Sequence, residues 1–365
     1  MSKNHANIGA DRAEGTSQRC GNPSAIIFSV SNEFSPKTQP PKPLLPYQLR
    51  KLLVKDGFRD GDTDQAESVL NRISYQHLSE YFGLLKNISN TEYRSFKILH
   101  RLSLFDRKLQ SLLMEGIGIF ELQFRAQFSY SLAASEDPFA HRNQSNFKNK
   151  QHYKDFLESY EKEVNRQIKK RNKKVIKAVD KYGDLPLWLA VETMSFGTLS
   201  MLYNNTRSKN VRKSVSDSFG VKYEVFTSWT RALSTLRNQC AHFGSVCPHG
   251  LISRPKRIEG FSYKNNDHFY YAILIIEYLL GHDRLYTDDL SITYSLSFAK
   301  SVVNLFNDFE NILDIVRVPK NWASLLFNET ITGAEWEHEG DVGGKIRDIY
   351  IQVEDENGNR TRIKP

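Results

Sequence analysis

The chain has 365 residues, of which 39% are hydrophobic and 25% are charged, and it contains 22 Phe and 17 Tyr. This composition excludes a wholly disordered, collagen-like or low-complexity protein, and the length allows one large domain or two ordinary ones. The net charge of +8 is compatible with a polyanionic partner such as a nucleic acid. Three cysteines are too few for a disulfide scaffold, which favours a reducing compartment.

No secretion signal or membrane span is predicted. The first ten residues are polar, and the most hydrophobic run, Tyr270–Gly281, is interrupted by Glu277. That run is far shorter than the roughly 20 apolar residues that a membrane-spanning helix needs. We therefore expect a cytoplasmic protein that does not enter a membrane.

Helical spacing dominates the chain. Residues 1–40 are rich in Ser, Asn, Gly and Pro and predict a flexible N-terminal segment, whereas from Tyr47 to about Val318 the apolar residues recur mostly at steps of three and four. The predicted fold class is therefore all-α. Expected helices cover Thr63–Arg72, Tyr75–Leu85, Phe156–Asp180, Leu187–Tyr203, Glu224–His242, Asp267–Leu280 and Thr293–Val316.

One further helix is expected to be unusually long. Its apolar stripe is formed by Leu109, Leu112, Leu113, Ile117, Phe120, Phe124, Phe128 and Leu132. Gly116 and Gly118 lie in the middle of this stripe, where we expect them to weaken or kink the helix.

The last part of the chain, residues 328–365, is predicted to be a separate C-terminal extension. Apolar residues at 349, 351 and 353 alternate with polar ones, which is the period of a strand. The Asn357-Gly358 pair follows and favours a tight turn, so we expect a small hairpin with Arg360–Lys364 as its second strand.

A basic run lies at Arg166–Lys181, with the sequence RQIKKRNKKVIKAVDK. One interpretation is a solvated helix face with a narrow apolar stripe. The other is a surface that binds RNA phosphates, although without aromatic residues it would contribute little choice of base. The RNA-binding candidates are Lys169, Lys170, Arg171, Lys173 and Lys174.

Several catalytic motifs are absent from the sequence, including a Walker loop, GxGxxG, HExxH and a pair of CxxC motifs. An Arg-x(4–6)-His spacing occurs at Arg72 with His77, at Arg94 with His100 and at Arg237 with His242. Because this spacing arises easily by chance, the surrounding sequence must decide whether any of these pairs is functional.

The Arg237 pair lies in the sequence LRNQCAHFG, at the end of an apolar helix that Gly244 is expected to cap. On an ideal helix Arg237 and His242 are separated by about 140° around the axis. The arginine must therefore reach across, or the last turn must unwind, for both to meet one phosphate. The alternative interpretation is a capped helix end with a solvated arginine.

Six segments in register give this motif its context. They are KPLLPYQLRKLLVKDGF, RISYQHLSEYFGLL, LFDRKLQSLLMEGIGIFELQFRAQFSYSLA, PLWLAVETMSFGTLSMLY, LRNQCAHFG and VPKNW, and together they span roughly residues 41 to 325. In this order they resemble the bacterial abortive-infection family of the AbiD and AbiF type. The resemblance implies an all-α, HEPN-like helical domain with helical additions over residues 41–327, a role in phage defence, and a ribonuclease site at Arg237 and His242.

The chemistry implied by this resemblance needs no metal and no cofactor. The RNA 2′-hydroxyl would attack the adjacent phosphate, His242 would act as general acid or base, Arg237 would stabilise the phosphate charge, and Asn238 would orient the site. HEPN nucleases tend to pair two such sets, which implies a homodimer, and a noncoding RNA or a protein would serve as regulator. Such proteins often carry a second histidine where this chain has Phe243.

Three further residues are candidates for supporting roles. Glu192 is the only charged residue from Leu185 to Tyr203, so it either pairs with a cation, for which Arg237 is the candidate, or lies on the one exposed face. Glu121 and Arg125 are four residues apart and most simply form an ion pair along one helix.

Two alternatives to a ribonuclease remain open at the level of the sequence. The first is a non-catalytic RNA-binding module of a defence or toxin–antitoxin system. The second is a zinc-stabilised interaction protein, because Cys240, His242, Cys247 and His249 place four ligand side chains within ten residues. Their spacing is not one of the usual zinc patterns, and the predicted site contains no metal.

Overall fold

The computed structural model describes residues 42–86, 93–281, 289–330, 335–339, 348–354 and 360–363. The chain divides into two units, Met1–Leu44 and Leu45–Pro365, and the second unit holds all the elements discussed below. The predicted flexible segment 1–40 lies outside the described residues.

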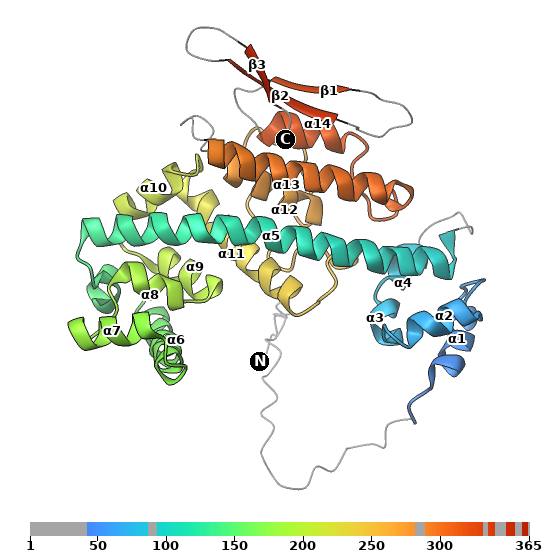
Figure 1. Ribbon diagram of the computed structural model, residues 1–365, viewed down its shortest axis with the longest axis horizontal. Helices are drawn as coiled ribbons and strands as arrows, with labels where there is room; N and C mark the ends of the chain where they lie inside the picture. Colours follow the sequence, from blue (N-terminus) through green and yellow to red (C-terminus); the bar gives the residue numbers. More distant parts are fainter. Residues whose placement is uncertain are drawn as a thin grey trace, which may run out of the picture. The chain divides into compact units, whose positions relative to one another are not determined.

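Helices form almost all of the second unit (Figure 1). They are α1 (Pro46–Lys55), α2 (Asp64–Leu70), α3 (Tyr75–Ser79), α4 (Phe82–Lys86), α5 (Phe96–Ser135), α6 (Lys150–Lys169), α7 (Lys173–Tyr182), α8 (Leu187–Thr193), α9 (Phe196–Asn205), α10 (Lys209–Asp217), α11 (Tyr223–Ala241), α12 (Phe269–Gly281), α13 (Asp289–Asp308) and α14 (Trp322–Thr330). Short 3₁₀ turns lie at Ala140–Arg142, Gln144–Asn146 and Glu310–Ile312. The predicted all-α fold class is confirmed.

The 40-residue helix α5 organises this unit, because α8, α10, α11, α12 and α13 all pack against it. Figure 1 shows α12 and α13 along one side of α5 and α8 and α9 along another. The helix continues through Gly116 and Gly118. A Cβ atom at Gly116 would lie 2.6 Å from side-chain atoms of both Ile276 and Phe298, so this glycine allows α12 and α13 to approach α5 closely.

An aromatic cluster fills the space between α5 and the helices that precede the candidate site. Phe120 and Phe124 on α5 make edge-to-face contacts with Phe226 on α11, at centroid distances of 5.9 and 5.4 Å. Phe196 and Tyr203 on α9 pack against the same α5 residues. Each of these side chains is fully or almost fully buried, so α11 is firmly attached to α5 and α9.

Two predicted helices are each divided in two by local backbone chemistry. The predicted helix Phe156–Asp180 is α6 followed by α7, because Arg171 adopts a left-handed φ of 57° and the Asn172 side chain caps the start of α7. The predicted helix Leu187–Tyr203 is α8 followed by α9, with Ser195 capping α9. Both predictions were wrong about continuity because the apolar spacing runs across the break.

Other boundaries also differ from the predictions. The expected helix Tyr75–Leu85 is the pair α3 and α4, and the expected helix Thr63–Arg72 begins only after Thr63, whose side chain caps α2. The expected helix Thr293–Val316 is α13, which ends at Asp308, followed by the turn Glu310–Ile312. Helices α1, α10 and α14 were not among the expected elements.

The C-terminal extension forms a three-stranded antiparallel sheet of β1 (Glu335–Glu339), β2 (Asp348–Glu354) and β3 (Arg360–Ile363), in that order. Ile351 pairs with Ile363 and Glu354 with Arg360, so β2 and β3 form the predicted hairpin. The Asn357-Gly358 pair lies outside the described residues. Strand β1, which pairs with β2, was not predicted.

Candidate functional site

Helix α11 ends in a Schellman motif built around the predicted catalytic histidine. His242 is the C-cap, Phe243 adopts a left-handed φ of 58°, and the Phe243 N–H donates to Cys240 O at 3.0 Å. The Gly244 N–H donates to Gln239 O at 2.8 Å. The glycine therefore follows the left-handed position instead of occupying it, and the strained position belongs to a phenylalanine.

The three predicted catalytic residues lie at this helix end. Asn238 and His242 are exposed and Arg237 is half-buried. The guanidinium of Arg237 is 3.5 Å from Asn238 Oδ1, and among the described residues no hydrogen bond or ion pair joins Arg237 to His242. The last turn does not unwind, because the His242 N–H still donates to Asn238 O at 3.1 Å. All three side chains are thus available to a ligand at one helix end, with Asn238 and His242 on one face and Arg237 on another.

A buried carboxylate that the sequence analysis missed holds the loop after this helix. Asp106 on α5 is fully buried and accepts hydrogen bonds from the backbone N–H groups of Val246, at 3.0 Å, and Cys247, at 2.7 Å. It also accepts from the Tyr81 hydroxyl at 2.9 Å and from Gln110 Nε2 at 3.0 Å. These donors satisfy the buried acid and fix the chain immediately after α11 to α5.

Burial raises the pKa of two cysteines near this carboxylate. Burial, together with the charge of Asp106, raises the pKa of the Cys240 thiol to about 12 and raises the pKa of Cys247 well above its usual value. Both cysteines are buried and free. They are therefore neutral thiols at physiological pH, which suits core packing better than nucleophilic chemistry or metal binding.

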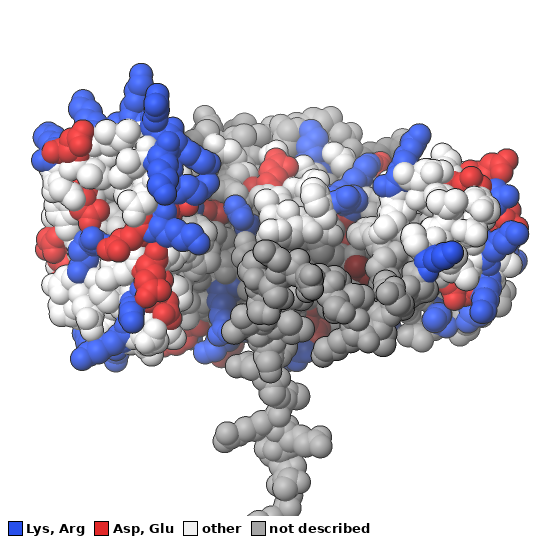
Figure 2. All heavy atoms as spheres, turned by 90° about the horizontal axis from the view of Figure 1, so that it is seen from below, with Lys and Arg blue, Asp and Glu red and all other residues white. Residues whose placement is uncertain are grey.

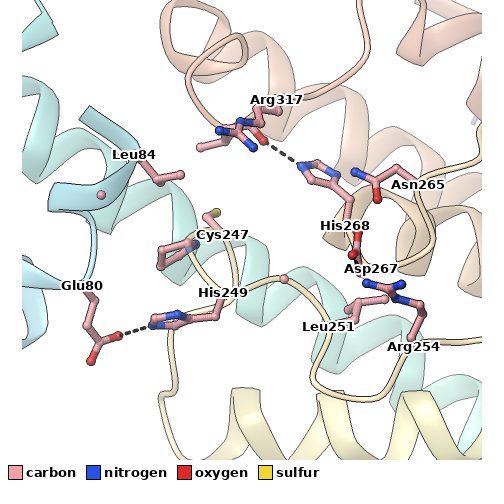
Figure 3. Close-up of a pocket in the computed structure, with 14 residues that line it drawn as sticks. Glu80, Leu84, Cys247, His249, Leu251, Arg254, Asn265, Asp267, His268 and Arg317 are labelled. Carbon is pink, nitrogen blue, oxygen red and sulfur yellow. Dashed lines mark hydrogen bonds and ion pairs between the residues drawn. The ribbon is translucent and has the colours of Figure 1, made fainter. Parts of the chain in front are cut away.

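Beyond the Asp106 contacts, the loop borders a pocket of about 600 Å³ (Figure 3). Ser245 donates to the carboxylate of Glu80, and His249 Nε2 is 3.6 Å from the same carboxylate oxygen. Across the pocket, Arg254 pairs with Asp267. His268 has both ring nitrogens engaged, with Val316 O at 2.8 Å and the Tyr270 N–H at 3.2 Å, and its burial lowers its pKa. Most polar groups of this pocket are thus committed to protein partners.

The zinc alternative finds no support in this geometry. Within the described part of the chain, no group of three or more His, Cys, Asp or Glu side chains is placed to hold a metal ion. His249 points toward Glu80, and Cys240 and Cys247 are buried thiols (Figure 3). The four residues that share a short stretch of sequence therefore do not form a metal site.

The candidate supporting residues have structural surroundings. Arg125 and Glu121 form the expected ion pair along α5, with side chains only 9% and 13% exposed. Arg125 also donates to the carbonyl oxygens of Val191 and Met194, where α8 ends. Glu192 is exposed on α8 and makes no ion pair with Arg237, so the exposed-face alternative is the one observed. The break between α8 and α9 removes the reason for expecting burial.

The five basic candidates lie on both sides of the α6–α7 break. Lys169 is the last residue of α6, Lys170 and Arg171 follow it, and Lys173 and Lys174 begin α7. All five are exposed, and none makes an ion pair with another described residue. Figure 2 shows Lys and Arg side chains gathered on this face toward the end where α6 and α7 lie. We call these five residues the basic patch.

Residues 68–247 match the family described as Abi-like protein. Through this region the chain belongs to the Abi-like family. The matched stretch begins within α2 and ends at Cys247, so it includes α5, Asp106 and the complete end of α11, although it is shorter than the resemblance noted over residues 41–325. Membership connects the chain with abortive infection, a form of phage defence. No curated protein and no solved structure matches the chain.

None of the described helices combines the length and the apolar character that crossing a membrane requires. The most apolar helix, α12, has 13 residues and is buried in the helical core.

Proposed function

We propose that this Abi-like protein is an abortive-infection effector that cleaves RNA at the end of α11. The observation that carries this proposal is that Arg237, Asn238 and His242 have no hydrogen bond or ion pair with another described element, at a helix end whose next residues are fixed by the buried Asp106. Such an arrangement presents polar side chains to a ligand from a rigid support, as catalytic groups require.

Each residue has a definite part in the proposed reaction. The 2′-hydroxyl of RNA attacks the adjacent phosphorus, and the bond to the 5′-oxygen of the next nucleotide breaks. His242 takes the proton of the attacking 2′-hydroxyl and delivers it to the leaving 5′-oxygen. Arg237 stabilises the charge on the phosphate oxygens, and Asn238 orients the phosphate. The products carry a 2′,3′-cyclic phosphate and a 5′-hydroxyl. Metal and cofactor are not required by this scheme.

A homodimer fits the placement of these side chains. Because Arg237 and His242 lie about 140° apart around α11, one of them has to reach across for both to contact one phosphate. A second copy of the helix end, brought alongside the first, would supply the complementary residue. We propose that the protein is active as a homodimer. A noncoding RNA or a protein regulator restrains this activity until infection.

The basic patch supports a second candidate function, a module that binds RNA without cutting it. Its five exposed cations have no ion-pair partners among the described residues, so they are available to phosphates. The patch serves the nuclease as a binding surface, but it would also suffice for a protein that only holds a structured RNA.

Bacterial growth and RNA binding, measured side by side, separate the two functions. If the protein is a nuclease, the wild type should arrest growth. Arg237→Ala combined with His242→Ala should then relieve the arrest while RNA binding persists. If the protein only binds RNA, replacing the basic patch with glutamines should abolish both RNA binding and growth arrest. The Arg237→Ala/His242→Ala protein should then still arrest growth. The second result would contradict the nuclease proposal.

A further inference from the structure

A second polar pocket, of about 620 Å³, lies between the start of α6, α9 and α11. Its only charged lining residues are Lys148, just before α6, and Arg231 on α11, and no aspartate or glutamate lines it. Neither cation makes an ion pair with another described residue, although Lys148 Nζ is 3.4 Å from the carbonyl oxygen of Asn204. The pocket is therefore positively charged and lacks a carboxylate of its own.

Further cations reinforce this charge. The pKa of Lys148 is lowered by burial and by the positive charges of Arg212 and Lys209. An anion bound among such cations is attracted to each of them, and this attraction offsets their mutual repulsion. An anionic group is the ligand that this wall of the pocket favours.

A neutral amide next to Lys148 has an oxygen without a hydrogen-bond partner. The Oδ1 atom of Asn204, on α9, is buried without a hydrogen bond. Its neighbour Asn205 is committed, since its amide donates to Asn149 O at 3.0 Å and accepts from Asn149 N at 2.8 Å. Buried amide oxygens are almost always paired, so Asn204 lacks a donor that a ligand can supply. Base amino groups and ribose hydroxyls are such donors.

Helix α11 connects this pocket with the proposed cleavage site. Asn238 and His242 follow Arg231 by seven and eleven residues, so the three residues lie within about 40° of one another on the same face of the helix. All three are exposed. The axial rise places them about 10 and 16 Å apart along α11. An RNA strand lying along this face would pass from the pocket to the proposed catalytic residues.

We propose that this pocket binds one unpaired nucleotide of the RNA substrate, near the phosphate that is cleaved. Lys148 and Arg231 hold the phosphate of this nucleotide, and Asn204 accepts a hydrogen bond from its base or its ribose. The substrate is accordingly single-stranded around the cleavage site. This inference rests on the proposed function, because it takes the pocket as part of the same substrate path.

The test measures binding in protein that cannot cleave, so that it does not depend on catalysis. The Arg237→Ala/His242→Ala protein is titrated with a labelled single-stranded RNA of about 12 nucleotides, a length within the range of single-strand binding sites. Adding Lys148→Gln and Arg231→Gln is expected to lower the affinity about tenfold. It is also expected to reduce the slope of log affinity against log salt by about 0.7, the contribution of the one single-strand phosphate that the two cations hold.

A matched control removes the same charge elsewhere. Lys55→Gln with Arg72→Gln replaces two exposed cations outside the pocket and should leave the affinity within about twofold. RNA containing 4-thiouridine should crosslink to peptides of the pocket wall, 148–152, 197–205 or 231–234. Equal loss of affinity in both double variants, or crosslinks confined to the basic patch, would overturn the proposal.

Two further arms separate the related explanations. If adenosine 3′-monophosphate alone binds the pocket and the RNA titration is unaffected by the pocket variants, the site takes a free nucleotide and the RNA proposal is wrong. If the wild type cleaves RNA and the pocket variants cleave it with unchanged KM, the pocket proposal fails while the cleavage proposal stands. If RNA occupies the pocket but the wild type never cleaves it, the cleavage proposal fails while the pocket still binds RNA.

Discussion

The two sides of the α11 end differ in how they use polar side chains. On the side facing α5, Asp106 is buried and accepts hydrogen bonds from four neighbouring residues, two of them in the loop that follows the helix. At the helix end itself, the side chains of Arg237, Asn238 and His242 make no hydrogen bond or ion pair with any other described element, and the Arg237 guanidinium is 3.5 Å from Asn238 Oδ1. A buried and fully paired acid contributes to stability, whereas side chains without partners on other elements are available to a ligand. Whether a polar side chain has protein partners, more than its residue type, therefore separates structural residues from candidate catalytic residues.

The largest structural effect is expected from removing the committed acid. Asp106→Ala should lower the free energy of unfolding by about 3 kcal/mol or more, because several buried donors lose their acceptor. Asp106→Asn should cost less, since the amide retains one acceptor oxygen. Urea unfolding measures both. Glu115→Gln, at an exposed acid on the same helix, is the matched control and should change stability by less than about 0.5 kcal/mol. A loss no larger for Asp106→Ala than for the control would contradict the supporting role.

His141 is a buried polar side chain without a hydrogen-bond partner, so it is the opposite case to Asp106. Both ring nitrogens are buried without a hydrogen bond, and burial lowers the pKa of His141 to about 4. The unfolded chain, with a pKa near 6.5, therefore binds the proton more tightly than the folded chain. Stability should be full above about pH 6.5 and should fall by about 3 kcal/mol as the pH drops toward 4.

His141→Leu should flatten this part of the pH dependence, which unfolding experiments at a series of pH values measure. His152→Gln replaces an exposed histidine and should leave the dependence unchanged. The same acid-induced loss of stability in His141→Leu and in wild-type protein would show that other groups, such as the buried His268, are responsible.

A smaller effect is expected at the boundary between the two sides, where Phe243 holds its left-handed conformation. Its ring is 64% exposed and lies against the Arg107 guanidinium, 4.4 Å from the ring centroid. Phe243→Gly and Phe243→Ala both lose this contact, but only glycine relieves the backbone strain. The glycine variant should therefore be more stable than the alanine variant by about 1 kcal/mol in thermal unfolding. The opposite order would contradict the left-handed cap.

The smallest effect is expected for Glu192→Gln, since this carboxylate is exposed and has no ion pair with Arg237. The free energy of unfolding should change by less than about 0.5 kcal/mol. Arg125→Met, which leaves the buried Glu121 and two carbonyl groups unpaired, is the contrasting variant and should be clearly destabilised. Clear destabilisation by Glu192→Gln would contradict this result and would support the Glu192–Arg237 ion pair considered in the sequence analysis.

Sequence reasoning located the long elements of the fold because their apolar periodicity is sustained. The expected helix Glu224–His242 differs from α11 by one residue at each end, and the stripe from Leu109 to Leu132 lies within α5. Periodicity failed where two helices share one apolar face across a break. There the division is decided by caps such as Asn172 and Ser195, whose side chains bond to the backbone of the next helix.

The candidate site divides in the same way. The position of Arg237 and His242 at a helix end could be predicted from local sequence, but Asp106 could not be assigned from the loop that it holds, 140 residues away. A signal was nevertheless present, because Asp106 falls between Phe105 and Leu109 on the apolar stripe of α5. A lone acid in a buried apolar helix needs a partner. Glu192 does not need one, because a helix break exposes its carboxylate, whereas the buried Asp106 does.

The most direct test of the account is the cleavage of total RNA by the purified protein in EDTA, followed by mapping of the product ends. The account predicts that wild-type protein yields 2′,3′-cyclic phosphate and 5′-hydroxyl ends, and that Arg237→Ala/His242→Ala protein, with unchanged thermal unfolding, yields none. Equal cleavage by both proteins, or none by either under conditions in which the wild type arrests growth, would contradict the assignment of the α11 end as the reacting surface.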